Sequence, residues 1–309
     1  MVIRNFLWKH ISAVVELESQ ILQAEGSSID NVKQSVEEYL LQPNLDVENN
    51  LFLYEDNGNL AGLAIVCPEP SIKRSVLILK IHPDYQFKNI QETLIDIALK
   101  RASYLRASVL HIQVGDNQFL TNILMNAGFK YVRTYWTMRW DLQPLHSTVI
   151  PTKYSFRPYG KRGDAEVLTK IQNDAFSGSW GFAPNSPEEI EYRANMGITS
   201  HEGIIFLNEG TNVRGYCWTY ILGSGKEKVG VISMIGIDPA FRQRGLGKPL
   251  LEAGLKHLSS RNVSQVELEV DSNNTAATKL YISMGFTKVG DRHWFEASPI
   301  PNLPTVPPS

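Results

Sequence analysis

Cysteine is scarce in this chain, whose 309 residues include only Cys67 and Cys217. Two cysteines cannot form a disulfide framework or a cysteine-rich metal cluster, so we expect a reducing, cytoplasmic environment. Long apolar runs are absent as well, so no segment is predicted to span a membrane. The first residues carry Arg4, Lys9 and Glu16 and lack the apolar centre of a secretory signal.

An excess of charge is also missing. The chain has 30 Lys and Arg against 32 Asp and Glu, a formal net charge of −2. A nucleic-acid-binding protein is expected to be basic, so the balance argues against that function class. The seven histidines show no spacing typical of metal ligands, so we predict no metal. With 43% hydrophobic and 20% charged residues, the sequence predicts a globular chain, long enough for two domains.

One stretch of the second half has the pattern of a strand, a turn and a helix. The apolar strand ends at Ile237, Asp238-Pro239 breaks it, and leucines at helical spacing begin at Leu246. The turn between them contains Gly245 and Gly247. Its basic residues are Arg242, Arg244 and Lys248.

A helix start of this kind suits a pyrophosphate. The first N–H groups of a helix have no internal partner and carry the positive end of its dipole. Glycines let an anion approach the backbone, and the neighbouring cations add charge. The alternative is a helix that merely begins with glycine and is surrounded by solvated cations. The pattern is neither a P-loop, because Lys248 is not followed by Ser or Thr, nor a Rossmann fingerprint, because a third glycine is missing.

The spacing Arg242-x-x-Gly245-x-Gly247 after a strand resembles the acetyl-CoA signature of the GNAT superfamily of N-acetyltransferases. A second motif of that superfamily follows in the expected order, Asn274-x-x-Ala277-x-x-Leu280-Tyr281-x-x-x-Gly285-Phe286. The resemblance implies an α/β fold with a mixed sheet, acetyl-CoA as cofactor, and direct attack of a primary amine on the acetyl group. It implies cofactor contacts from Ile235, Ile237, Arg242, Gln243, Arg244, Gly245, Leu246, Gly247, Lys248 and Asn274.

The two halves of the chain can be placed in register. Pro83 falls on Pro239 with a shift of 239 minus 83, which is 156 residues. The first half then has Gln86 for Arg242, Asn89 for Gly245 and Gln91 for Gly247. It has therefore lost the bare backbone that a pyrophosphate needs, and an internal repeat is indicated. We expect two GNAT-like acyl-CoA N-acyltransferase domains in tandem: a degenerate one over 1–145, a catalytic one over 152–298, and a proline-rich tail over 299–309.

Two side chains are the candidates for proton transfer. The family often places a tyrosine beside the cofactor sulfur, so the resemblance implies that Tyr281 donates a proton to the leaving thiolate. Its alternative role is core packing on an amphipathic helix. Glu269 is the predicted base, and because it shares a sheet face with Glu267, the alternative is that both acids are simply solvated. His293 and Asp271 are reserve candidates.

The layout of the chain and its Trp-Gly-Phe loop resemble tandem enzymes of the mycothiol-synthase type. Those enzymes are thought to use a glutamate on the strand before Asp-Pro, whereas residues 229–233 contain no acid here. The acceptor is expected to be a small-molecule or peptide amine. The residues predicted to bind it are Asn173, Phe176, Trp180 and Trp218, with core packing as the alternative for each aromatic.

Other functions remain compatible with these motifs. One is a non-catalytic acyl-CoA-binding or regulatory protein that kept the cofactor turn. Another is nucleotide binding at residues 245–248. Asn274 has a local alternative too, because an asparagine there can cap the helix that follows. The sequence contains no feature that predicts the oligomeric state.

Overall fold

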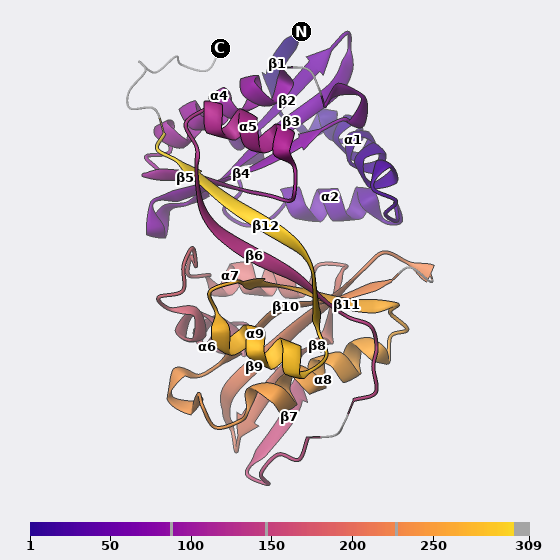
Figure 1. Cartoon of the computed structure of the whole chain (residues 1–309), viewed down its shortest axis with the longest axis vertical. Helices are drawn as coiled ribbons and strands as arrows, with labels where there is room; N and C mark the ends of the chain where they lie inside the picture. Colours follow the sequence, from indigo (N-terminus) through magenta and orange to yellow (C-terminus); the bar gives the residue numbers. More distant parts are fainter. Residues whose placement is uncertain (87–88, 146–147, 226–227, 300–309) are drawn as a thin grey trace. The chain divides into compact units, whose positions relative to one another are not determined.

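The computed structural model describes residues 1–86, 89–145, 148–225 and 228–299, which form two compact units. Unit 1 comprises Met1–Tyr135 and Asp291–Ser309, and unit 2 comprises Trp136–Gly290. The strand β6 (Lys130–Trp140) therefore begins in unit 1 and ends in unit 2. The strand β12 (Thr287–Ala297) begins in unit 2 and ends in unit 1 (Figure 1).

Unit 1 is built on a mixed sheet. Its strand order is β1-β2-β3-β4-β5-β12-β6, in which β4 and β5 are parallel and β12 pairs antiparallel with β5. Its elements are β1 (Val2–Asn5), α1 (Ile11–Ala24), α2 (Val32–Leu40), α3 (Val47–Asn50), β2 (Leu51–Asp56), β3 (Asn59–Glu69), β4 (Arg74–Ile81), α4 (Ile90–Tyr104), β5 (Val109–Val114) and α5 (Gln118–Asn126). Short 3₁₀ turns lie at Trp8–His10, Pro70–Ile72 and Pro83–Tyr85.

Unit 2 repeats this order of strands and helices without a counterpart of α3. Its strands follow the order β6-β11-β10-β9-β8-β7, in which β10 and β11 are parallel. Its elements are β7 (Tyr154–Pro158), α6 (Asp164–Phe176), α7 (Pro187–Ala194), β8 (Thr199–Glu209), β9 (Asn212–Leu222), β10 (Val229–Ile237), a 3₁₀ turn (Pro239–Phe241), α8 (Gly247–Ser259), β11 (Gln265–Asp271) and α9 (Thr275–Ser283).

The sheet of unit 2 buries apolar side chains on both faces. On one face, Leu250 and Leu255 of α8 join a buried cluster with Val266 and Leu268 of β11. On the other face, Leu168 of α6 joins a second cluster with the aromatic side chains of β9. Because successive side chains of a strand point to opposite faces, Cys217 of β9 joins the first cluster, whereas Tyr216 and Trp218 join the second.

The fold class predicted from the sequence is confirmed, and so is the repeated order of elements. Adding 156 to the bounds of β4, α4 and β5 brings them onto β10, α8 and β11 within a residue or two at most ends. The division into units departs from the expected bounds 1–145 and 152–298 because β12 pairs with β5, so the last strand belongs to unit 1.

Two expectations concern the ends of the chain and membranes. Nearly all of the predicted tail, from residue 300 to residue 309, lies outside the described residues. Within the described residues, every helix is too short or too polar to cross a bilayer.

Candidate functional site

The sheet of unit 2 opens between β10 and β11. Their parallel pairing covers Val229–Val231 and Gln265–Glu267, and within the described residues it goes no further. β10 continues to pair with β9 as far as Ile237, with a bulge between Ile232 and Met234. A bulge re-aims a strand and ends local pairing. The β11 side of β10 is therefore left open along the residues that include Ile235 and Ile237.

The turn after β10 is held by bonds to its own backbone and to α6. The Asp238 carboxylate accepts a hydrogen bond from the Ala240 N–H at 3.0 Å. The Arg242 guanidinium donates to the carbonyl of Ala175, the penultimate residue of α6, and to the Ile237 carbonyl at 3.4 Å. Arg242, which we predicted to bind the cofactor, therefore anchors the turn, and that contact restricts how freely its side chain reaches an anion.

The start of α8 leaves its backbone donors unused. Leu246 is the N-cap residue and has no side-chain cap, and the first helical hydrogen bond runs from the Leu250 N–H to the Leu246 carbonyl at 3.3 Å. Among the described residues, none accepts a hydrogen bond from the N–H groups of residues 245–248. Such a group of free donors at the positive end of a helix is an anion site.

Glycine is needed at the two positions of this turn for different structural reasons. Gly245 has φ +73°, a left-handed conformation that favours glycine, and a Cβ added there meets nothing within 4 Å. A Cβ on Gly247 lies 3.2 Å from Leu280 Cδ2 of α9. Gly245 therefore keeps space open beside the free N–H groups, and Gly247 lets α8 and α9 pack closely.

The corresponding turn of unit 1 is closed by a side chain. Gln91 stands where unit 2 has Gly247, is only 4% exposed, and donates from Nε2 to the Gln86 carbonyl at 2.6 Å. Residues 87–88 lie outside the described part of this turn. Gln113 aligns with Glu269, and the fully buried Leu124 falls where Tyr281 stands. The first unit thus has a buried glutamine in place of Gly247 and lacks both candidate proton-transfer groups.

Tyr281 combines a buried ring with an available hydroxyl. It is 6% exposed and packs in the cluster of α8 and β11, with its ring centroid 5.8 Å from that of Phe286. Among the described residues no group forms a hydrogen bond with its hydroxyl. The hydroxyl oxygen is nevertheless not completely buried. Burial, with a smaller contribution from Cys217, raises its pKa well above the ordinary value. It is therefore a neutral phenol with a proton to donate.

The two acids of β11 differ in their surroundings. Glu267 accepts a hydrogen bond from Arg139 Nη2 at 2.9 Å, as half of an ion pair, and another from Gln265 at 2.9 Å. Glu269 is exposed, and its carboxylate helps to raise the pKa of Tyr220, after burial of that phenol. Glu269 therefore lies on the open part of the face, near an aromatic residue of β9.

The reserve candidates have other partners. His293 belongs to unit 1, where its ring nitrogens lie 3.0 Å from the Thr134 hydroxyl and 3.3 Å from the Asp116 carboxylate. Asp271 accepts a hydrogen bond from the Asn273 N–H at 2.9 Å in the turn before α9. In the same turn, Asn274 accepts from the Ala277 N–H at 3.1 Å, so it does cap α9.

The side chains predicted to bind the acceptor are partly used for structure. The Asn173 side chain donates to and accepts from the backbone of Asn185, both at 3.0 Å, and so fixes the loop before α7. The Phe176 and Phe182 rings lie 5.6 Å apart, and Trp180, between them in the chain, is partly exposed. Trp218 is only 2% exposed, so its ring is mainly core.

Comparison with known proteins identifies the family. Residues 165–286 match the Acetyltransferase (GNAT) family. Mycothiol acetyltransferase of Thermobispora bispora is 30% identical over 247 residues, which cover 77% of this chain and 80% of that protein. The chain belongs to the GNAT acetyltransferase family. Mycothiol acetyltransferase of Nocardia farcinica is 27% identical and covers 86% of this chain and 88% of its own length.

Solved structures of GNAT proteins share the fold over almost the whole chain. A GCN5-related N-acetyltransferase from Sphaerobacter thermophilus has a TM-score of 0.71 at 18% identity, covering 98% of this chain and 96% of that one. A tandem GNAT protein from the clavulanic acid biosynthesis pathway has a TM-score of 0.75 at 13% identity, covering 97% and 99%. The tandem GNAT architecture predicted from the motifs is therefore confirmed.

Family membership also establishes the reaction class. The protein is an acetyl-CoA-dependent N-acetyltransferase, as the sequence motifs predicted. The alternative of a non-catalytic acyl-CoA-binding or regulatory protein is not favoured, because the curated relatives bear the name of an enzyme.

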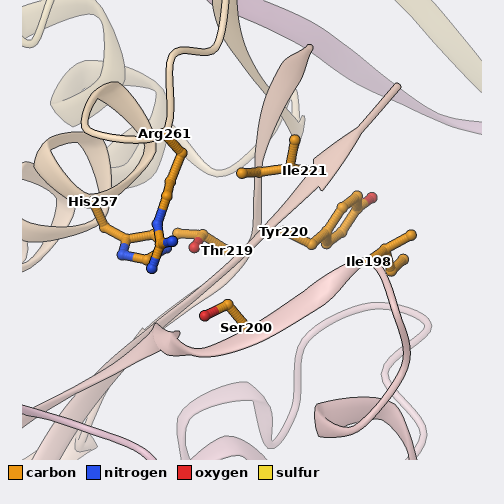
Figure 2. Close-up of a pocket in the computed structure, with 7 residues that line it drawn as sticks. All are labelled: Ile198, Ser200, Thr219, Tyr220, Ile221, His257 and Arg261. Carbon is orange, nitrogen blue, oxygen red and sulfur yellow. The ribbon is translucent and has the colours of Figure 1, made fainter. Parts of the chain in front are cut away.

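A hollow in this GNAT protein lies at the other end of α8 (Figure 2). His257, in the last turn of α8, and Arg261 face Thr219 and Ser200 across it, while the Tyr220 ring points away from them. Two of its polar side chains already have partners, because Arg261 pairs with Glu202 and the Thr219 hydroxyl donates to the Gly203 carbonyl at 2.8 Å. No residue predicted to bind the cofactor lines it.

Sequence reasoning missed Arg193 of α7. Its guanidinium carbon lies 5.3 Å from the centroid of the Trp218 ring. Nothing in the sequence around Arg193 marks it, because an arginine in the last turn of a short helix is normally a solvated cation. Only the packing of α7 against the sheet, in the cluster that contains Trp218, brings it over an aromatic ring.

Proposed function

We propose that acetyl transfer takes place in unit 2 and that unit 1 binds no acetyl-CoA. The observation that carries this proposal is the set of free N–H groups at residues 245–248, beside the open space at Gly245. In this proposal the diphosphate of the cofactor accepts hydrogen bonds from those groups, with added charge from Arg244 and Lys248. Gln243 and Leu246 contribute backbone to the same turn, and Arg242 holds the turn in place.

The rest of the cofactor site is proposed along the open side of β10. The backbone there, at Ile235 and Ile237, is free on the side of β11 and can donate to the carbonyl groups of an extended pantetheine arm. Asn274 caps α9 through its side-chain oxygen, which leaves its amide nitrogen to donate to the same arm. Acetyl-CoA supplies a thioester carbonyl that an amine can attack.

We assign the two proton transfers to side chains on opposite faces of the sheet. Glu269 takes a proton from the acceptor ammonium, directly or through water, so that the nitrogen lone pair is free to attack. The Tyr281 hydroxyl gives its proton to the sulfur as the carbon–sulfur bond breaks, and the second proton that the nitrogen loses on becoming an amide restores the phenol through water. The opening between β10 and β11 supports this division, because it connects the face of Glu269 with the face of Tyr281.

The acceptor is proposed to be a small-molecule primary amine. The relatives named mycothiol acetyltransferases support this class over a peptide amine. We do not carry the relatives' own substrate over to this chain, because its residues 229–233 lack the acid that such enzymes are thought to use. Phe176, Trp180 and Trp218 then form the surroundings of the acceptor, and Asn173 positions the loop that carries them.

A pair of isosteric variants tests the cofactor site. Asp and Asn both tolerate a left-handed conformation, so Gly245→Asp and Gly245→Asn differ mainly by one negative charge beside the free N–H groups. Isothermal titration calorimetry with CoA is expected to show a Kd that is 10- to 100-fold larger for Gly245→Asp than for Gly245→Asn. A change of this size corresponds to the loss of about one charge-assisted hydrogen bond. Asn89→Asp, at the matching position of unit 1, is expected to leave the Kd unchanged. Equal CoA affinity of the two Gly245 variants, loss of affinity in Asn89→Asp, or tighter binding of ATP than of CoA contradicts the proposal.

A further inference from the structure

Arg193 is a half-buried cation on the face of the sheet that carries Glu269. α7 places its guanidinium over the Trp218 ring, at 5.3 Å from the centroid. Trp218 shares its face of β9 with Tyr216 and Tyr220, because alternate residues of a strand point the same way. Burial lowers the pKa of Arg193, and the neighbouring Tyr216 phenol opposes that shift most strongly. The guanidinium is therefore partly desolvated.

The charge of Arg193 is not balanced by an ion pair. Its side chain makes one hydrogen bond, from Nη1 to Asn185 Oδ1 at 3.3 Å, and no carboxylate of the described chain lies within ion-pairing distance. The nearby Glu189 carboxylate accepts a hydrogen bond from the Ser186 N–H at 2.6 Å in the capping box of α7. A guanidinium has five N–H donors, so most of those on Arg193 are free. Partly desolvated and underused donors of this kind are suited to a carboxylate ligand.

The strand register places this guanidinium level with Glu269. Tyr220, Val231 and Glu267 are partners across β9, β10 and β11. Trp218 and Glu269 each lie two residues farther along in the same direction, on the same face. Two strand spacings, about 10 Å, separate the paired Tyr220 and Glu267, and the opening between β10 and β11 lies between Trp218 and Glu269.

The phenol of Tyr220 supports this placement. Burial raises its pKa, Glu269 raises it further, and Arg193 lowers it, so Tyr220 is within electrostatic reach of both charges. The face therefore presents an acid and a cation on either side of the opening, with the aromatic side chain of Tyr220 near both.

We propose that the acceptor is an amino acid, or a compound of that type, whose carboxylate is bound by Arg193 while its amine faces Glu269. This inference rests on the proposed function of unit 2. An acceptor that meets both residues carries a primary amine and a carboxylate. Arg193 is thus a specificity-determining residue.

The test compares acceptors that differ only at the carboxylate. Thiol release from acetyl-CoA is measured with the proteinogenic α-amino acids and with their carboxamides, and mass spectrometry identifies the N-acetylated products. We expect kcat/KM for the best amino acid to exceed that of its carboxamide by 10- to 100-fold.

Variants separate ligand binding from packing. Arg193→Met keeps the length of the side chain over Trp218 and removes the charge. It is expected to lower kcat/KM for the amino acid 10- to 100-fold and to keep kcat/KM for the carboxamide within threefold of the wild-type value. The Kd of CoA is expected to stay unchanged. Arg193→Lys is expected to recover part of the loss. Arg162→Met, an exposed arginine of the same unit, is the matched control and is expected to behave as the wild type.

Each contrary result has a distinct meaning. Carboxamides that react as fast as amino acids, or an Arg193→Met variant that loses both activities equally, overturn the carboxylate assignment and leave the proposed function intact. The assignment is also overturned if neither set reacts while CoA still binds to unit 2. A protein that fails to bind CoA at all, or binds it in unit 1, refutes the proposed function itself.

Discussion

Replacing Tyr281 by phenylalanine removes one oxygen atom from a buried ring. No group within the described chain bonds that hydroxyl, so no hydrogen bond is lost on substitution. The ring keeps its contact with Phe286 at 5.8 Å and its place in the core cluster. Typical hydrogen-bond deletions destabilise by about 1 kcal/mol, whereas here the free energy of unfolding is expected to change by less than about 0.5 kcal/mol. The Kd of CoA is expected to stay within twofold.

Turnover is expected to respond very differently. A positioned proton donor contributes about 10²- to 10⁴-fold to the rate, so kcat of Tyr281→Phe is expected to fall by at least 10². Burial raises the pKa of Tyr281 above its ordinary value, so the phenol stays protonated throughout the range in which an amine is acetylated. Loss of rate at constant affinity therefore isolates the proton that the hydroxyl delivers.

The assay follows thiol release under saturating acetyl-CoA and amine, with chemical denaturation as the measure of stability. Tyr154→Phe is the matched control, because Tyr154 is equally buried at 6% exposure and belongs to the same cluster. It is expected to retain kcat. If Tyr281→Phe keeps kcat within threefold of the wild type, the donor role is wrong. If both variants lose activity and stability together, packing explains the effect.

Three further predictions give independent checks, two of them with a matched control variant. Glu269→Gln is expected to lower kcat at least 10²-fold, whereas Glu267→Gln is expected to lose only the Arg139 pair, less than about 1 kcal/mol of stability, and to keep kcat; equal losses of activity contradict the assignment of the base. Asn274→Ala and Asn117→Ala each remove a helix cap and are expected to destabilise by about 1 kcal/mol in denaturation, but only Asn274→Ala is expected to weaken CoA binding in calorimetry. Burial raises the pKa of the Cys217 thiol from 9.0 to about 12. The unfolded thiol then loses its proton first, so stability falls by about 1.4 kcal/mol per pH unit above pH 9, and Cys217→Ala is expected to remove that part of the alkaline loss.

The sequence was most informative where structure is local. The leucine spacing after Leu246 and the Asp238-Pro239 break depend on a few neighbouring residues, and the helix start predicted from them is present. The repeat could also be read because the shift of 156 residues brings like elements together. The boundary of the units could not be read, since it depends on the pairing of β12 with β5, far apart in the chain.

The details of the candidate site depend on partners that sequence does not reveal. Arg242 has the character of a phosphate ligand in the sequence, yet its guanidinium bonds the Ala175 carbonyl. Asn173 has the character of an acceptor ligand, yet both ends of its amide hold Asn185. The sequence around Arg193 does not indicate a functional role, because the exposure of this side chain and its contact with Trp218 follow from the way α7 packs on the sheet.

The two units differ in the side chains that stand at one helix start. In unit 1 the buried side chain of Gln91 donates to the Gln86 carbonyl and so occupies the turn. In unit 2 glycine stands at the same place, and the N–H groups of residues 245–248 have no acceptor among the described residues. The aligned changes of Glu269 to Gln113 and Tyr281 to Leu124 fit the same division, because proton-transfer groups have no use beside a turn that cannot hold the acetyl donor.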